Sequence, residues 1–163
     1  MKRLVIACLV LPLLLVGRIQ LASAHCEVPC GIYHDQLRFE QMLEDQTTIA
    51  KAIAQIGELT KAMENGVDPL SANQLVRWVT TKEDHATKTQ GVIAQYFMTQ
   101  RIKPGTDEES QKAYLKKLTA AHAVMQAAMK CKQTADPATA DALKEAIYDF
   151  YRAYEGKEPQ LEE

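Results

Sequence analysis

Apolar residues recur every three or four positions from residue 34 to about residue 156, and this spacing limits what the chain can fold into. The α-helix has 3.6 residues per turn, so side chains at this spacing line one face of a helix. No segment alternates apolar and polar residues for long enough to form a strand. The turn-forming segments 65–69, 103–105 and 134–137 divide the pattern into four. The sequence therefore predicts an all-α fold, an antiparallel four-helix bundle over residues 34–157.

The predicted helices cover residues 34–65, 71–101, 107–132 and 137–156, and residues 158–163 form a polar tail. We expect Ser71 to cap the second helix, Thr106 or Asp107 the third, and Pro137 to be the first residue of the fourth. Gly66 should take the left-handed conformation that ends the first helix. The predicted core positions are Phe39, Met42, Ile49, Ile53, Ile56, Met63, Leu75, Trp78, Val79, Ala86, Ile93, Tyr96, Phe97, Tyr114, Leu118, Ala121, Met125, Ala128, Leu143, Ile147, Phe150 and Tyr154.

The first 24 residues have the three parts of a secretory signal peptide. Lys2 and Arg3 are followed by an apolar run over residues 4–16, and residues 22–24 have the Ala-Ser-Ala pattern of a signal-peptidase site. The apolar run is shorter than the roughly 20 residues that span a bilayer, although an uncleaved anchor is the alternative. We expect cleavage after Ala24, export to the periplasm or the extracellular space, and no membrane contact after the leader is removed.

The remaining 139 residues suit a single acidic domain. Three of the 19 Lys and Arg residues lie in the leader, which leaves 16 against 21 Asp and Glu, a net charge of −5. The basic stripe of a nucleic-acid-binding protein is missing, so no nucleic-acid partner is expected.

Cleavage after Ala24 would give an N-terminus that is rich in metal ligands, the segment 25–33, which we call the hook. Its sequence, His-Cys-Glu-Val-Pro-Cys-Gly-Ile-Tyr, offers the His25 imidazole, the thiolates of Cys26 and Cys30, the Cys26 amide nitrogen and the new α-amine. Amine, amide and two sulfurs can lie in one plane, which favours Ni(II) or Cu(II) over tetrahedral Zn(II). Pro29 and Gly31 allow the chain to turn back so that both sulfurs face the metal.

The hook resembles the nickel-binding segment of nickel superoxide dismutases, H-C-x-x-P-C-G-x-Y at the mature N-terminus. His25, Cys26, Pro29, Cys30, Gly31 and Tyr33 occupy its defining positions. The resemblance implies a four-helix bundle and one nickel ion per chain that cycles between Ni(II) and Ni(III). It also implies superoxide as substrate and a homo-oligomer, a hexamer in that family.

The same resemblance gives roles to individual residues. His25 would be the axial ligand, with Cys26 and Cys30 as the thiolate ligands. Tyr33 would line the entry for the substrate. Glu40 on the first helix best matches the glutamate that holds the axial histidine, and His85 stands where the family has a supporting arginine.

Two other interpretations of the cysteines stay open. Three remain after cleavage, and an oxidising compartment permits a Cys26–Cys30 disulfide, with Cys131 most simply a small buried residue. The alternative function is a non-catalytic exported bundle whose hook stores a metal or is closed by that disulfide.

Overall fold

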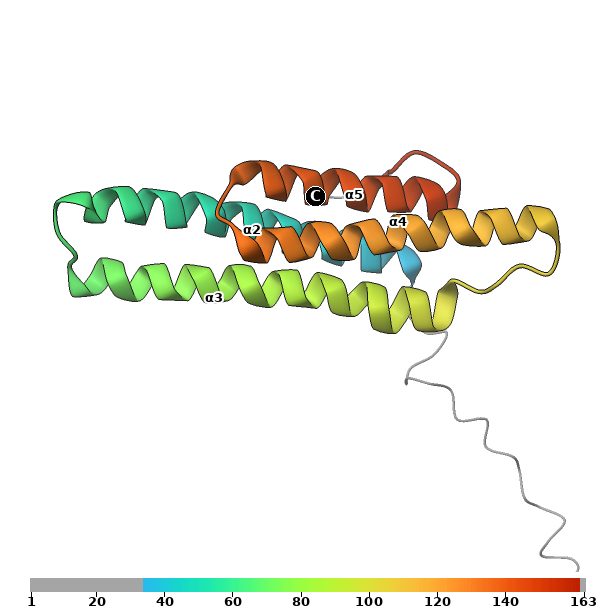
Figure 1. The fold of residues 1–163 in the computed structure, drawn as a ribbon, viewed down its shortest axis with the longest axis horizontal. Helices are drawn as coiled ribbons and strands as arrows, with labels where there is room; N and C mark the ends of the chain where they lie inside the picture. Colours follow the sequence, from blue (N-terminus) through green and yellow to red (C-terminus); the bar gives the residue numbers. More distant parts are fainter. Residues whose placement is uncertain (1–33, 162–163) are drawn as a thin grey trace, which may run out of the picture.

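The computed structural model of the protein describes residues 34–161, and they form an antiparallel bundle of four long helices (Figure 1). The helices are α2 (Asp35–Ala62), α3 (Pro69–Gly91), α4 (Glu108–Gln133) and α5 (Pro137–Glu155). A 3₁₀ turn, η1 (Met63–Asn65), ends α2, and a π-helix, η2 (Val92–Arg101), continues α3. The described residues contain no strand, so the predicted all-α bundle is confirmed.

Each helix packs against two neighbours, so that α2, α3, α4 and α5 follow one another around the core. Phe39 of α2 lies at the centre of an aromatic cluster. Its ring centroid is 4.9 Å from that of Phe97, 5.1 Å from Phe150 and 5.0 Å from Tyr151. Centroid distances of this size are typical of favourable aromatic pairs, and the cluster joins α2, η2 and α5.

The two hairpins overlap only in part, because α2 and α3 extend past α4 and α5 at one end (Figure 1). The ammonium of Lys82 on α3 donates to the last carbonyls of α4, those of Cys131 at 2.6 Å and Lys132 at 2.7 Å. The first part of α3 therefore lies beyond the end of α4. This explains why the predicted core residues of that part are only half-buried or, in Val79, 39% exposed.

The start of α3 differs from the sequence prediction in the residue that caps the helix. Asp68, not Ser71, caps α3: its carboxylate accepts the backbone N–H groups of Leu70 and Ser71, both at 3.0 Å. Pro69 occupies the first helical position, where its fixed φ suits the helix, and this moves the cap three residues earlier. Asp107 caps α4 as one of the two expected residues, and Pro137 begins α5 as predicted.

Gly66 also differs from the prediction. It has φ 141° and ψ 144°, an extended conformation with positive φ that is open to glycine and not the left-handed helical one. The 3₁₀ turn η1 has already ended the helix before it, so no left-handed residue is needed there.

The polar tail returns to the bundle. The Gln36 amide in the first turn of α2 donates to the Gln160 carbonyl at 3.1 Å, and Leu161 packs against the core. The last described residues thus lie beside the first. No helix among residues 34–161 is long and apolar enough to cross a membrane.

Candidate metal centre

The predicted ligands lie outside the described residues. This applies to the whole hook, with His25, Cys26, Cys30 and Tyr33 and the bend residues Pro29 and Gly31. The structure instead shows the part of the bundle from which the hook departs. Within residues 34–161, no group of three or more His, Cys, Asp or Glu side chains is arranged to hold a metal ion.

Glu40 lies on α2, half-buried, in the helix that follows the hook. Its carboxylate accepts a hydrogen bond from the Gln36 side chain at 3.1 Å. Glu40 is five positions after Asp35 in the helix, which corresponds to about 7.5 Å along the axis. The carboxylate is thus within the first two turns of α2.

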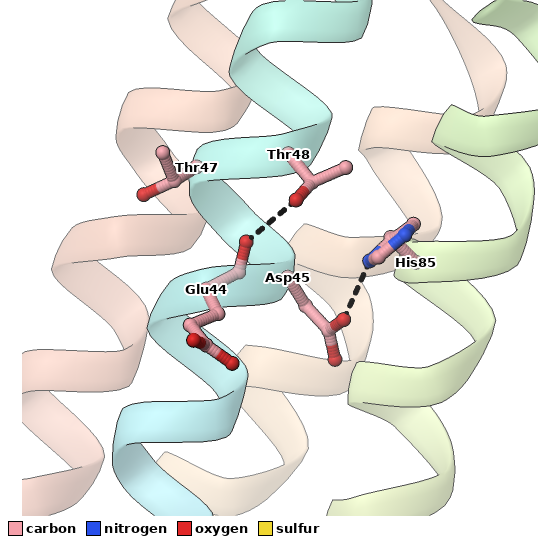
Figure 2. Close-up of a pocket in the computed structure, with 5 residues that line it drawn as sticks. All are labelled: Glu44, Asp45, Thr47, Thr48 and His85. Carbon is pink, nitrogen blue, oxygen red and sulfur yellow. Dashed lines mark hydrogen bonds and ion pairs between the residues drawn. The ribbon is translucent and has the colours of Figure 1, made fainter.

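His85 lies on α3 and bonds to α2 at Asp45. Figure 2 shows the imidazole above the Asp45 carboxylate, with 2.6 Å between His85 Nδ1 and Asp45 Oδ1. The side chain of Asp45 is only 6% exposed, and that of His85 is 24% exposed. An ionised carboxylate only accepts hydrogen bonds, so Nδ1 is the donor in this pair.

The Asp45 carboxylate is unusual because one of its oxygens is buried without a partner. Oδ2 has no hydrogen bond among the described residues. Burial raises the pKa of this carboxyl, and the hydrogen bond from His85 acts against that rise. His85 thus supplies the hydrogen bond that compensates the buried charge, and the charge of Lys88 acts in the same direction.

A shallow hollow lies beside the pair and is lined by Glu44, Asp45, Thr47, Thr48 and His85. In Figure 2 the Glu44 carboxylate points away from Asp45 and His85. Among the described contacts, Glu40 and His85 bond to Gln36 and Asp45 and not to each other. Their shared role beside the axial histidine stays a prediction.

A second polar cluster stands at the beginning of α2, and the sequence did not reveal it. The Asp35 carboxylate accepts three hydrogen bonds: from the Tyr96 hydroxyl at 2.5 Å, the Arg101 guanidinium at 2.5 Å and the Tyr154 hydroxyl at 2.8 Å. We call these four residues the Asp35 cluster. It joins the first residue of α2 to η2 and α5.

The charges of the cluster are mutually stabilising. Burial acts to raise the pKa of Asp35, but the bonds from Arg101, Tyr96 and Tyr154 outweigh it and lower that pKa below its ordinary value. Burial, together with the bond to Asp35, raises the pKa of Tyr96 and that of Tyr154 to about 12. At neutral pH the carboxylate is therefore charged and both phenols are protonated.

Sequence reasoning missed this cluster because its members are far apart in the chain. Asp35 is 61 residues from Tyr96, 66 from Arg101 and 119 from Tyr154. The helical spacing of Tyr96 and Tyr154 predicts only that they belong to the core. The available signal was an acidic residue at the first position of a helix, which ordinarily indicates only a favourable interaction with the helix dipole.

Cys131 is fully buried near the end of α4, as predicted. Its thiol donates to the Thr139 carbonyl at 3.3 Å, and burial raises the pKa of the thiol. A neutral, enclosed thiol of this kind is a packing residue and not a metal ligand.

Comparison with known proteins bears on the whole of this region. A sequence model of the family described as nickel-containing superoxide dismutase matches residues 20–158, which include the hook and all four helices. No curated protein and no solved structure gives a significant match.

Proposed function

Because the chain belongs to the nickel-containing superoxide dismutase family, we propose that its nickel is held by the hook after cleavage at Ala24. The protein is a nickel-dependent oxidoreductase that converts superoxide to oxygen and hydrogen peroxide. The observation that carries the proposal about the centre is the hook sequence, which falls inside the matched range.

The donor set of the hook fits nickel. The Cys26 and Cys30 thiolates, the Cys26 amide nitrogen, the α-amine of His25 and its imidazole would hold the metal, and strong sulfur and nitrogen donors of this kind suit Ni(II). Nickel bound there would supply one-electron redox chemistry, cycling between Ni(II) and Ni(III). Charge donation by thiolate and amide ligands favours the oxidised state of such a centre, and this brings its potential into the range that dismutation needs.

Other residues would control access and orientation. Tyr33 would line the entry for superoxide and order water that delivers protons. Glu40, close to the start of α2, would accept a hydrogen bond from the His25 imidazole and fix its direction. His85 would support that histidine from α3, and Asp45 would in turn fix the tautomer of His85.

Export and assembly complete the proposal. The leader would direct the chain to the periplasm or the extracellular space, and its removal would create the amine ligand. We infer a homo-oligomer, a hexamer by resemblance to the family, in which neighbouring subunits cover the hook. Light scattering of the mature protein tests the assembly, and a monomer at micromolar concentration would contradict it.

The decisive experiment compares three cysteine variants of the exported protein. Cys26→Ser and Cys30→Ser should each lose nickel, from about one ion per chain to almost none, and superoxide dismutation with it. Cys131→Ser is the matched control, because it changes a buried thiol outside the hook and should keep both. Nickel-free dismutation by the first two variants would place the centre elsewhere, whereas nickel without turnover in the wild type would favour the storage function.

The N-terminus provides a separate test. Mass spectrometry of the exported protein should find His25 as the first residue. A form with one alanine added before His25 converts the amine ligand into an amide, so its activity should fall by at least about a hundredfold. Full activity of the extended form would exclude the amine from the ligand set.

A further inference from the structure

We propose that Asp35 is a positioning residue that fixes the base of the hook to the bundle through the Asp35 cluster. This inference rests on the proposed nickel site, since it concerns how that site is held. It goes further because it assigns the task to a residue that binds neither nickel nor superoxide.

The place of Asp35 in the chain is the first argument. It is the first residue of α2 and comes two positions after Tyr33, the last residue of the hook. His34 between them is the N-cap, with extended backbone at φ −85° and ψ 131° and no side-chain capping bond. No side chain of His34 caps the start of α2, so the hydrogen bonds of Asp35 to the rest of the bundle hold it in place.

The contacts of Asp35 are the second argument. Its three donors come from η2 and α5, and its side chain is 15% exposed. Charge-assisted bonds of this kind are about twice as strong as bonds between neutral groups. They tie the first residue of α2 to two separate elements, to η2 through Tyr96 and Arg101 and to α5 through Tyr154.

The π-helix η2 carries two of the groups that hold Asp35. Ten residues of π-helix is an unusual length, since this conformation mostly occurs as single turns and is often found at functional sites. It contains both Tyr96 and Arg101, and the Arg101 guanidinium also lies 5.9 Å from the Tyr96 ring centroid. The wider helix thus presents two of the three donors to one carboxylate.

The residues that would hold a metal need a support that keeps them in place, because a displacement of about 1 Å at a reacting group can cost a hundredfold in rate. The Asp35 cluster supplies such a support next to the hook. Loss of the carboxylate should therefore loosen the hook while the bundle stays folded around its aromatic core.

The test compares Asp35→Asn with Tyr151→Phe in the mature protein as purified. The control removes another tyrosine hydroxyl of α5, one that donates to the neutral Gln36 amide in the same turn of α2 at 3.2 Å. Amide hydrogen exchange over residues 31–39 should become about tenfold faster in Asp35→Asn and stay unchanged in the control. Exchange over residues 45–56 should be the same in both.

Two nickel measurements complete the experiment. Release of nickel to EDTA should be about tenfold faster in Asp35→Asn, and the paramagnetic resonance spectrum of the oxidised nickel should change. If Asp35→Asn does not fold, the double variant Tyr96→Phe, Tyr154→Phe keeps the carboxylate and its helix-dipole interaction, and should show the same effects more weakly.

The inference would be overturned if Asp35→Asn exchanged its amides and released nickel at the same rates as the wild type. It would also be overturned if Tyr151→Phe changed these rates as much as Asp35→Asn does. A wild-type protein without nickel would instead contradict the proposed function, and the exchange data would still decide whether Asp35 holds the segment.

Discussion

At the scale of single residues, the bundle contains two carboxylates whose environments have opposite effects on them. Asp35 is surrounded by donors, and its pKa is lowered. Asp45 is buried with one oxygen unpartnered, and its pKa is raised. Both residues lie on α2, so the same helix carries one carboxylate that its surroundings stabilise and one that burial destabilises.

Replacing His85 by alanine should therefore destabilise the fold by roughly 2 kcal/mol, because it leaves the buried Asp45 carboxylate without its donor. The loss should become smaller as the pH falls towards the raised pKa of Asp45, where the carboxyl becomes neutral. Urea unfolding at several pH values measures this. His122→Ala, which removes an exposed histidine of α4, should have no effect, and an equal loss there would contradict the explanation.

The two phenols of the Asp35 cluster predict an alkaline transition. A pKa of about 12 in the folded state against about 10 in the unfolded chain means that the stabilisation is fully present below pH 10. It is lost as the pH rises from 10 to 12. Melting temperatures across this window should decline more steeply for the wild type than for Tyr154→Phe.

At the scale of helices, the sequence predicted the four elements because their apolar stripes are long and their end signals are strong. The predictions that were wrong concern local details of the helix ends. Asp68 caps α3 in place of the predicted Ser71, because Pro69 between them fixes where the helix begins. The π-helix was not predicted, because its buried residues Ile93, Tyr96 and Phe97 keep the three- and four-residue spacing expected of an α-helix.

Gly57 and Gly105 differ in the space around them, and therefore in what a substitution by alanine should do to stability. A Cβ at Gly57 of α2 would meet no atom within 4 Å, so Gly57→Ala should stabilise the fold by about 1 kcal/mol through helix propensity. A Cβ at Gly105 would come within 2.2 Å of the Gln111 backbone nitrogen. Gly105→Ala should therefore lower the melting temperature while Gly57→Ala raises it, and thermal unfolding followed by circular dichroism compares them.

A buried cation links α3 to the end of α4. Lys82 is 4% exposed and donates to two terminal carbonyls of α4. Lys82→Met keeps the apolar stem but leaves those carbonyls without their donor, so we expect a loss of roughly 2 kcal/mol and faster amide exchange in the last turn of α4. Lys51→Met, at an exposed position of α2, is the control and should change neither.

At the scale of the whole molecule, fold and site differ in what the sequence could predict. The hook is contiguous, so residue types and spacing were enough to propose its chemistry. The groups around it are not contiguous. The partnership of His85 with Asp45 spans 40 residues, and that of Asp35 with Tyr154 spans 119. Such pairs depend on how the helices pack, which one sequence does not specify.

The return of residues 160 and 161 to the first turn of α2 determines where foreign sequence can be attached. A tag before His25 would block the amine that cleavage creates. A polyhistidine tag at the other end would follow a tail in which Gln160 bonds to Gln36, and its imidazoles would compete with the hook for nickel. The connection between α2 and α3 lies at the far end of the bundle (Figure 1) and contains exposed Val67. Affinity handles and immobilisation linkers are therefore best inserted there, where they leave both chain ends unmodified.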